Sequence, residues 1–405
     1  MKKLLIFLVF FTILFAGDTN LELLQKDKKE YRNLDKKSIE ERYKYLKYDW
    51  LSPINTELGI TRKHSFSDEK IDKQDRYSKS ASIGFTQSIF ESGGIEFKID
   101  YAENRFKYEL MSWENQNYQL LYSLYDTLLE IKKIKLELEQ NDFQVLNKEI
   151  ELIIKKIQYD AGKSDIIELN NAVMSKNLII KENINIENSL KEKEMELKKY
   201  TDLNFDDIEI LDFKPINKKD FLDKNFDILQ EDLKVDMLNS SYKINKSSYL
   251  PKVTISTRAT HANSDDSFNK MVKDTNKDDS SASVGLNLSM PLYDFNKKAK
   301  LQESKIEVLK QKALVNDLKN ETAYDFEQSL SQIDRFEKFI NTIKENIKLY
   351  DELIVANKIS NQAGMTAKYD LEILENTRSI NVYDVLINEI KILQEYSRLY
   401  FKIRG

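Results

Sequence analysis

The sequence predicts a mainly α-helical chain with a membrane β part: long antiparallel coiled-coil helical hairpins plus four transmembrane β-strands. Three observations predict this fold class. Glycine and proline are scarce, at nine and four in 405 residues, while 32% of the residues are charged, a composition typical of long helices. Two very long segments, 95–161 and 296–363, contain neither glycine nor proline. Four segments of about ten residues alternate apolar and polar side chains.

Residues 1–17 have the pattern of a secretory signal peptide. Two lysines precede an apolar run at 4–15, and Ala16 and Gly17 supply the small residues expected before a cleavage site. The run is too short for a bilayer core that needs about 20 helical residues, and an uncleaved anchor is the alternative. We therefore expect an exported protein.

Composition excludes several classes of function. Removing the leader leaves 61 basic and 68 acidic residues, a net charge of −7, which does not favour a nucleic acid partner. The absence of cysteine excludes disulfides, a thiol nucleophile, a zinc ribbon and a lipidated N-terminus. With two histidines and few glycines, the chain shows no catalytic triad, metal cluster or phosphate loop. We expect no enzyme activity and no cofactor.

Internal similarity divides the mature chain into two repeats, at 18–215 and 216–405. Ser82-Ile83-Gly84-Phe85 recurs 201 residues later as Ser283-Val284-Gly285-Leu286, and Ala161-Gly162-Lys163-Ser164 recurs 202 residues later as Ala363-Gly364-Met365-Thr366. Each repeat is predicted to contain one β-hairpin and one long helical hairpin.

The predicted strands cover about 53–64 and 80–91 in the first repeat, and 251–261 and 281–291 in the second. In the last of these, Val284, Leu286 and Leu288 alternate with Ser283, Gly285 and Asn287. A half-buried strand of a soluble protein shows the same alternation. However, a length of about ten residues suits a tilted membrane crossing, and long polar loops suit its outer side.

The predicted helical hairpins cover about 95–200 and 296–403, with shorter helices at 21–48 and 222–247 and an irregular connector at 201–220. A segment of 66 helical residues would be about 99 Å long. Apolar residues step by three and four along each first arm, which is the seam of a left-handed coiled coil. The seam residues are Phe143, Leu146, Ile150, Ile153 and Ile157, then Ile333, Phe336, Ile340, Ile343, Ile347, Tyr350 and Ile354.

Four strands cannot close a barrel, and open strand edges cannot face lipid. If the strands are transmembrane, several chains must therefore contribute to one barrel. Three chains would give 12 strands and a tube of paired helices, which is a geometry that conducts solutes.

At this point the chain resembles the TolC family of outer-membrane efflux channels. The resemblance is carried by the strand entry Tyr249–Val253, the strand-to-helix corner Met290–Asp294, and the two helix turns Tyr159–Ser164 and Ala363–Leu371. It covers essentially the whole mature chain.

The resemblance implies a homotrimer, with a 12-stranded barrel in outer-membrane lipid above a 12-helix periplasmic tunnel. It also implies a periplasmic adaptor (membrane fusion protein) and an inner-membrane pump or ABC transporter as partners. The family meets its adaptor at the helix-turn tips, where glycine permits a positive φ and Ser or Thr can cap the next helix. Here these tips are Gly162, Lys163, Ser164, Gly364, Met365 and Thr366.

The resemblance also implies a periplasmic gate narrowed by acidic residues after the second turn. Asp370 matches one such position, and Glu168 is its counterpart in the first repeat. The family's second acidic position is Ile373 here, so Glu372 and Glu375 are further gate candidates. A ring of three Asp370 carboxylates would attract cations; a solvated helix face explains these acids about equally well.

Three alternatives stay open at this stage. His64 and His261 occupy matching places near one rim, where a trimer would gather six imidazoles, although strand-end histidines are usually solvated. An exported coiled-coil scaffold or tether without a pore would use the same seams. Within transport, small molecules (drugs or metals) and proteins are all candidate substrates, because specificity mostly resides in the inner-membrane partner.

Overall fold

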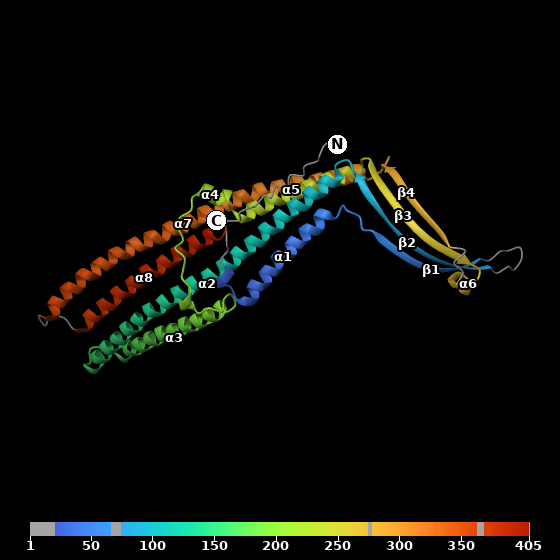
Figure 1. Ribbon diagram of the computed structural model, residues 1–405. Helices are drawn as coiled ribbons and strands as arrows, with labels where there is room; N and C mark the ends of the chain where they lie inside the picture. Colours follow the sequence, from blue (N-terminus) through green and yellow to red (C-terminus); the bar gives the residue numbers. More distant parts are fainter. Residues whose placement is uncertain (1–20, 66–73, 274–277, 363–367, 405) are drawn as a thin grey trace. The chain divides into compact units, whose positions relative to one another are not determined.

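The computed structural model describes residues 21–65, 74–273, 278–362 and 368–404 (Figure 1). The predicted leader at 1–17 lies outside them. Long helices and one four-stranded antiparallel sheet dominate the chain, as predicted. The elements are η1 (Leu21–Leu23), α1 (Lys26–Tyr48), β1 (Asn55–Ser65), β2 (Gln74–Phe90), α2 (Gly94–Asp160), α3 (Ile166–Leu197), η2 (Phe205–Asp207), α4 (Lys218–Asp223), α5 (Phe226–Ser247), β3 (Lys252–Asp265), α6 (Phe268–Lys273), β4 (Asp279–Ser289), α7 (Lys297–Gln362) and α8 (Lys368–Tyr400).

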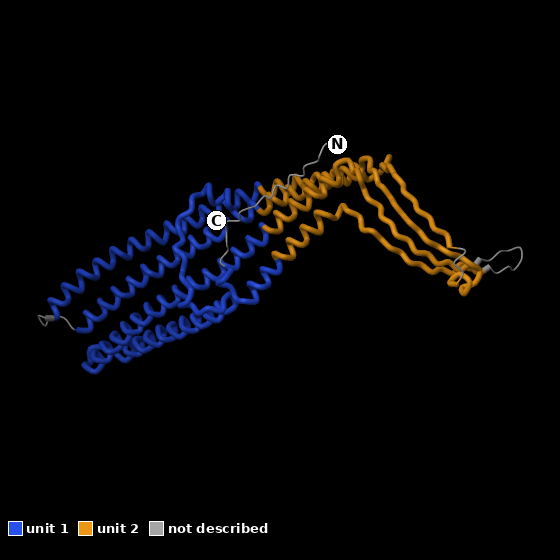
Figure 2. The backbone as a smooth tube through the Cα atoms, in the orientation of Figure 1, with its two compact units in different colours: residues 1–35, 111–229, 316–405 blue, residues 36–110, 230–315 orange. Residues whose placement is uncertain are grey.

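The chain forms two compact units (Figure 2). Unit 1 contains residues 1–35, 111–229 and 316–405, and unit 2 contains residues 36–110 and 230–315. Each unit takes segments from both predicted repeats. The repeats, which stay a prediction, are therefore not the compact units.

The sheet belongs to unit 2 and has the strand order β1-β2-β3-β4. β2 begins six residues before the predicted strand at 80–91, and β3 ends four residues after the predicted strand at 251–261. The added segments are polar and pair with each other, for example Ser78 with Ser264 and Lys79 with Asn263. Backbone hydrogen bonds between strands do not depend on apolar side chains. The alternation of apolar and polar residues therefore could not reveal these added segments.

The register places two chemically different faces on the sheet. We call one the apolar face; it carries Thr56, Ile83, Ala259 and Ala282 in one row across the four strands, with Leu58 and Ala81 in the next row and Val284, Leu286 and Leu288 further along β4. The opposite face, the polar face, carries mostly serine, threonine, asparagine and glycine. This sorting follows from the two-residue period of a strand.

In unit 2 the helical segments neighbour one another in the order α1, α2, α5, α7. Tyr43 of α1 stacks on Phe106 of α2, with 4.7 Å between ring centroids. Asn104 of α2 donates to Ser240 of α5 at 3.0 Å. A small apolar cluster of Val235, Val308 and Val315 then joins α5 to α7.

In unit 1 the order is α3, α2, α8, α7. Asn183 of α3 donates to Asp142 of α2 at 2.7 Å, and Gln140 of α2 donates to Asp384 of α8 at 2.7 Å. Arg378 of α8 forms an ion pair with Asp351 of α7. The two helical hairpins therefore lie side by side, with α3 and α7 at the outer edges of this unit (Figure 1).

The best-buried core of unit 1 gathers around the connector and the end of α8. Phe221 of α4, Phe326 of α7 and Leu399 of α8 are at most 2% exposed and pack together. Phe213 and Phe401 extend this core through further aromatic contacts. The segment predicted as irregular thus supplies anchoring side chains, because its few aromatic residues find partners far away in sequence.

The predicted seams are covered unequally. Ile333, Ile340 and Ile354 are buried, as is Ile150, but Ile153 and Ile157 are exposed. A single chain therefore leaves part of the first seam open to solvent. Within the described residues, no helix has an apolar stretch long enough to cross a bilayer.

Candidate functional site

The first helix turn, between α2 and α3, is closed by the backbone of its glycine. Gly162 has a φ of +67°, and a Cβ at this position would meet nothing within 4 Å. Its N–H donates to the carbonyl of Tyr159, and the N–H of Lys163 donates to that of Gln158 at 2.8 Å. The glycine is therefore required for its left-handed conformation.

The cap of the return helix differs from the expected one. Asp165, and not Ser164, caps α3, because its side chain accepts a hydrogen bond from the Glu168 N–H at 2.8 Å. The Ser164 hydroxyl instead donates to the Glu168 carboxylate at 2.7 Å. Aspartate also favours the positive end of the helix dipole, so the acid next to the serine takes the capping position.

Glu168, the gate candidate of the first repeat, is tied into this turn. Lys155 of α2 donates to its carboxylate at 2.8 Å. The hydrogen bond from Lys155, followed by the one from Ser164, lowers the pKa of Glu168. Glu168 therefore fastens the two arms of the hairpin at their exposed end.

The second turn was predicted at Gly364, Met365 and Thr366, which lie outside the described residues. α8 begins at Lys368, and Asp370 is exposed in its first turn.

The other acids of the second hairpin that we consider for the gate have cationic partners. Glu372 lies 3.1 Å from Lys368, and Glu375 lies 2.9 Å from Lys358 of α7. Of the four gate candidates, Asp370 alone makes no ion pair with the part of the chain that the structure describes. It is therefore the candidate whose charge is most available.

A row of polar contacts joins α2 to α8, and no pattern in the sequence marks it. Besides Gln140 and Asp384, the Asn376 amide donates to Asn147 at 2.9 Å, and Gln394 donates to Glu130 at 2.9 Å. In the sequence, these amide and carboxylate residues look like ordinary solvated positions of a helix. They form hydrogen bonds because α2 of the first repeat packs beside α8 of the second.

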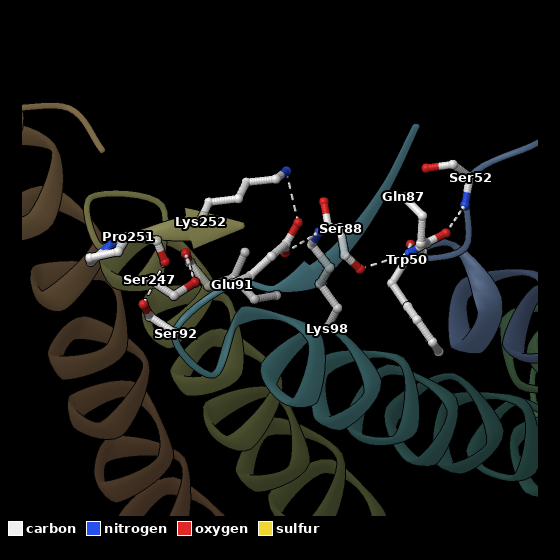
Figure 3. Close-up of polar contacts among 11 residues, drawn as sticks. Trp50, Ser52, Gln87, Ser88, Glu91, Ser92, Lys98, Ser247, Pro251 and Lys252 are labelled. Atoms are coloured by element: carbon white, nitrogen blue, oxygen red, sulfur yellow. Dashed lines mark hydrogen bonds and ion pairs between the residues drawn. The ribbon is translucent and has the colours of Figure 1, made fainter. Parts of the chain in front are cut away.

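The strand-to-helix junction of the first repeat, in unit 2, contains a cluster of ion pairs and hydrogen bonds (Figure 3). Glu91 accepts from Lys98 of α2 at 2.7 Å and from Lys252 of β3 at 2.8 Å. Burial by itself raises the pKa of Glu91, but the two lysines outweigh it and lower the pKa to about 2. Ser92, with a φ of 52°, donates to the carbonyl of Pro251 at 2.7 Å.

A neighbouring contact in the same view anchors the entrance to β1 (Figure 3). The Gln87 side chain accepts from the Ser52 N–H at 2.9 Å and donates to the Trp50 carbonyl at 3.0 Å. These side chains therefore hold the sheet's three junction segments in one arrangement.

The junction of the second repeat uses an aspartate in the same role. Asp294 accepts from the Tyr249 hydroxyl at 3.1 Å and from the Asn296 N–H at 2.8 Å. Beside it, Leu292 and Phe295 are almost fully exposed. The strand entry and the strand-to-helix corner thus include a partly buried hydrogen bond and exposed apolar side chains.

Both histidines contact the second strand of their own hairpin. His64 Nδ1 lies 2.6 Å from an Asp75 oxygen, and His261 lies 2.8 Å from Ser280 Oγ and 3.3 Å from an Asp278 oxygen. Among the described residues, no three His, Cys, Asp or Glu side chains gather in a way that could hold a metal ion.

The sequence and the fold of this chain are similar to those of known proteins. Residues 219–381 match the sequence model of the family described as outer membrane efflux protein. The matched segment covers less than half of the chain. This match confirms the resemblance to outer-membrane efflux proteins that the sequence carries. A comparison with curated protein sequences gives no match.

Solved structures share the fold of this chain at low sequence identity. The CusC structure, reported with transmembrane channel formation, has a TM-score of 0.73 at 11% identity and covers 95% of this chain and 90% of its own. The Campylobacter jejuni CmeC outer membrane channel has a TM-score of 0.73 at 12% identity, with 94% and 83% covered. The Vibrio cholerae outer membrane protein VceC has a TM-score of 0.70 at 12% identity, with 94% and 95% covered. These likenesses support the fold alone.

Proposed function

We propose that three copies of this chain form one channel-tunnel, which exports solutes passively across the outer membrane. The observation that carries the proposal is the open sheet. Within the described strands, β1 and β4 each pair on one side only. Their free backbone groups need partners before the sheet can enter lipid. Pairing β4 of one copy with β1 of the next would supply them and close a 12-stranded barrel.

The apolar face supports contact with lipid. Leu58, Val284 and Leu286 are all more than 70% exposed on it. A contiguous apolar surface of this kind is unfavourable in water. A closed sheet would turn this face to the bilayer and the polar face to the lumen.

The outer helices of unit 1 support association in the same way. On α3, Ile167 and Met195 are exposed, and on α7, Leu349, Val355 and Ile359 are exposed. These exposed side chains lie on the two helices at the edges of the layer, so α7 of one copy can pack on α3 of the next. Such packing would complete a ring of 12 long helices.

The helix-turn tips are the proposed docking site for a periplasmic adaptor, which would connect the channel to an inner-membrane pump or ABC transporter. Gly162 and Lys163 lie exposed in the first tip. Because the chain has no cysteine, a Lys163→Cys variant carries a single reactive thiol for crosslinking. We expect crosslinks to a co-expressed adaptor from Lys163→Cys and none from Lys191→Cys, which is exposed farther along α3. Equal crosslinking from both positions would contradict tip docking.

The first experiment measures assembly. In mild detergent, light scattering should give a protein mass near three chains, and omission of detergent should remove the protein from solution. A monomer or dimer that stays soluble without detergent would instead support the coiled-coil scaffold. Conductance across a planar bilayer then tests the pore itself.

The periplasmic gate is tested at Asp370, the candidate without a cationic partner among the described residues. Asp370→Lys should lower the preference of the channel for cations, whereas Glu372→Gln should have a smaller effect because Lys368 already balances that charge. Unchanged ion selectivity in Asp370→Lys would remove this residue from the gate.

A further inference from the structure

The polar face of the sheet carries charge of one predominant sign. Within the described strands, four basic and two acidic residues lie on it, namely Lys63, Arg76, Lys252, Arg258, Glu57 and Asp279. Serine, threonine, asparagine and glycine occupy nearly all its other positions. The face therefore has an excess of two positive charges per chain.

The basic side chains differ in whether an acid balances them. Arg258 Nη2 lies 2.7 Å from the Glu57 carboxylate and 2.9 Å from Ser82 Oγ. These groups line a hollow of about 670 Å³ on the polar face. Arg258 is thus neutralised by its neighbour, and its removal alone would leave an unpaired glutamate.

Lys63 and Arg76 have no such neighbour. They are directly opposite each other in the antiparallel β1–β2 ladder, where like charges destabilise a sheet. The Arg76 guanidinium donates to the neutral Ser264 hydroxyl at 3.0 Å. Neither cation forms an ion pair within the described chain. Two unbalanced cations on facing positions have an unfavourable interaction that a passing anion would relieve.

From this placement we propose that the Lys63–Arg76 pair makes the strand-lined part of the conduit favour anionic solutes. The inference rests on the proposed channel function, which turns the polar face to the lumen. Lumen charges act on permeating ions through water, with a Debye length of about 10 Å at 0.1 M salt and about 3 Å at 1 M. Six cations about 15 Å from the axis would change the anion-to-cation permeability ratio about threefold at 0.1 M salt.

The test is the reversal potential of the purified channel in a planar bilayer under a potassium chloride gradient. The Lys63→Gln/Arg76→Gln double variant should lower the chloride-to-potassium permeability ratio about threefold near 0.1 M salt and leave it unchanged near 1 M. Arg62→Gln is the matched control, because Arg62 lies on the apolar face and is paired with Asp75 at 2.9 Å. It should not change the ratio.

Thermal stability separates this role from a structural one. Removing two like charges from facing positions should leave the melting temperature of the double variant unchanged or raised. A lowered melting temperature with unchanged selectivity would mean that the pair is structural, and it would overturn the inference.

The failures of the two proposals are distinguishable. A conducting channel whose selectivity is the same in the wild type, the double variant and the control contradicts the Lys63–Arg76 inference alone. A wild-type protein that forms no conducting channel contradicts the proposed function, and the inference falls with it.

Discussion

Replacement of Glu91 tests whether charge holds the strand-to-helix junction together. Glu91→Gln keeps the size of the side chain and removes the carboxylate that accepts from Lys98 and Lys252. A pKa lowered from 4.5 to about 2 corresponds to about 3 kcal/mol at 1.36 kcal/mol per unit. Because Lys98 and Lys252 are 34% and 44% exposed, solvent screening reduces our expectation to about 2 kcal/mol.

The pH dependence has a definite sign. The folded-state pKa of Glu91 lies below the value of about 4.3 expected in the unfolded chain. Its stabilisation is therefore complete above that unfolded value and is lost as the pH falls toward 2. The difference between wild type and Glu91→Gln should be about 2 kcal/mol at pH 7 and vanish near pH 2.

The assay is urea unfolding of the detergent-solubilised protein, followed by tryptophan fluorescence, at a series of pH values. Glu103→Gln is the matched control, since Glu103 forms an exposed helical pair with Lys107 at 3.0 Å and should cost less than about 0.5 kcal/mol. A Glu91→Gln difference that persists unchanged at the lowest pH would refute the electrostatic explanation. Equal effects of the two variants at pH 7 would refute the importance of the junction.

Three further predictions concern packing and caps. Gly84→Ala should strongly destabilise the sheet, because its Cβ would lie 2.6 Å from a backbone oxygen of β3, whereas Gly59→Ala meets only a serine hydroxyl at 3.3 Å; protease resistance of the folded protein would distinguish the two. Asp165→Ala should cost about 1 kcal/mol as a lost helix cap, and Ser164→Ala less, in the same urea assay. Phe326→Ala should cost about 3–5 kcal/mol, since that ring is 2% exposed in the core of unit 1; a loss below about 1 kcal/mol would mean that the cluster is not a core.

The sequence could predict those features that depend on neighbours along the chain. The absence of glycine and proline from 95–161 predicts a helix that is observed as Gly94–Asp160. Alternation predicts the four strands, and a lone glycine predicts the turn at Gly162, because a positive φ is a property of one residue. The sequence could not predict that Asp165 rather than Ser164 caps α3, since either side chain can cap a helix.

The tertiary structure decided what depends on residues distant in sequence. Glu168 belongs to the turn because Lys155 reaches it, while Asp370 has no such partner among the described residues. The pairing of Lys63 with Arg76 follows from the strand register, and the ties between α2 and α8 join residues more than 220 positions apart. Local periodicity fixes which face a side chain occupies, but the partner it meets depends on how separate segments pack. For this reason the sequence by itself determined the helices and strands of this protein and its resemblance to outer-membrane efflux proteins, and the tertiary structure decided which of its charges are balanced.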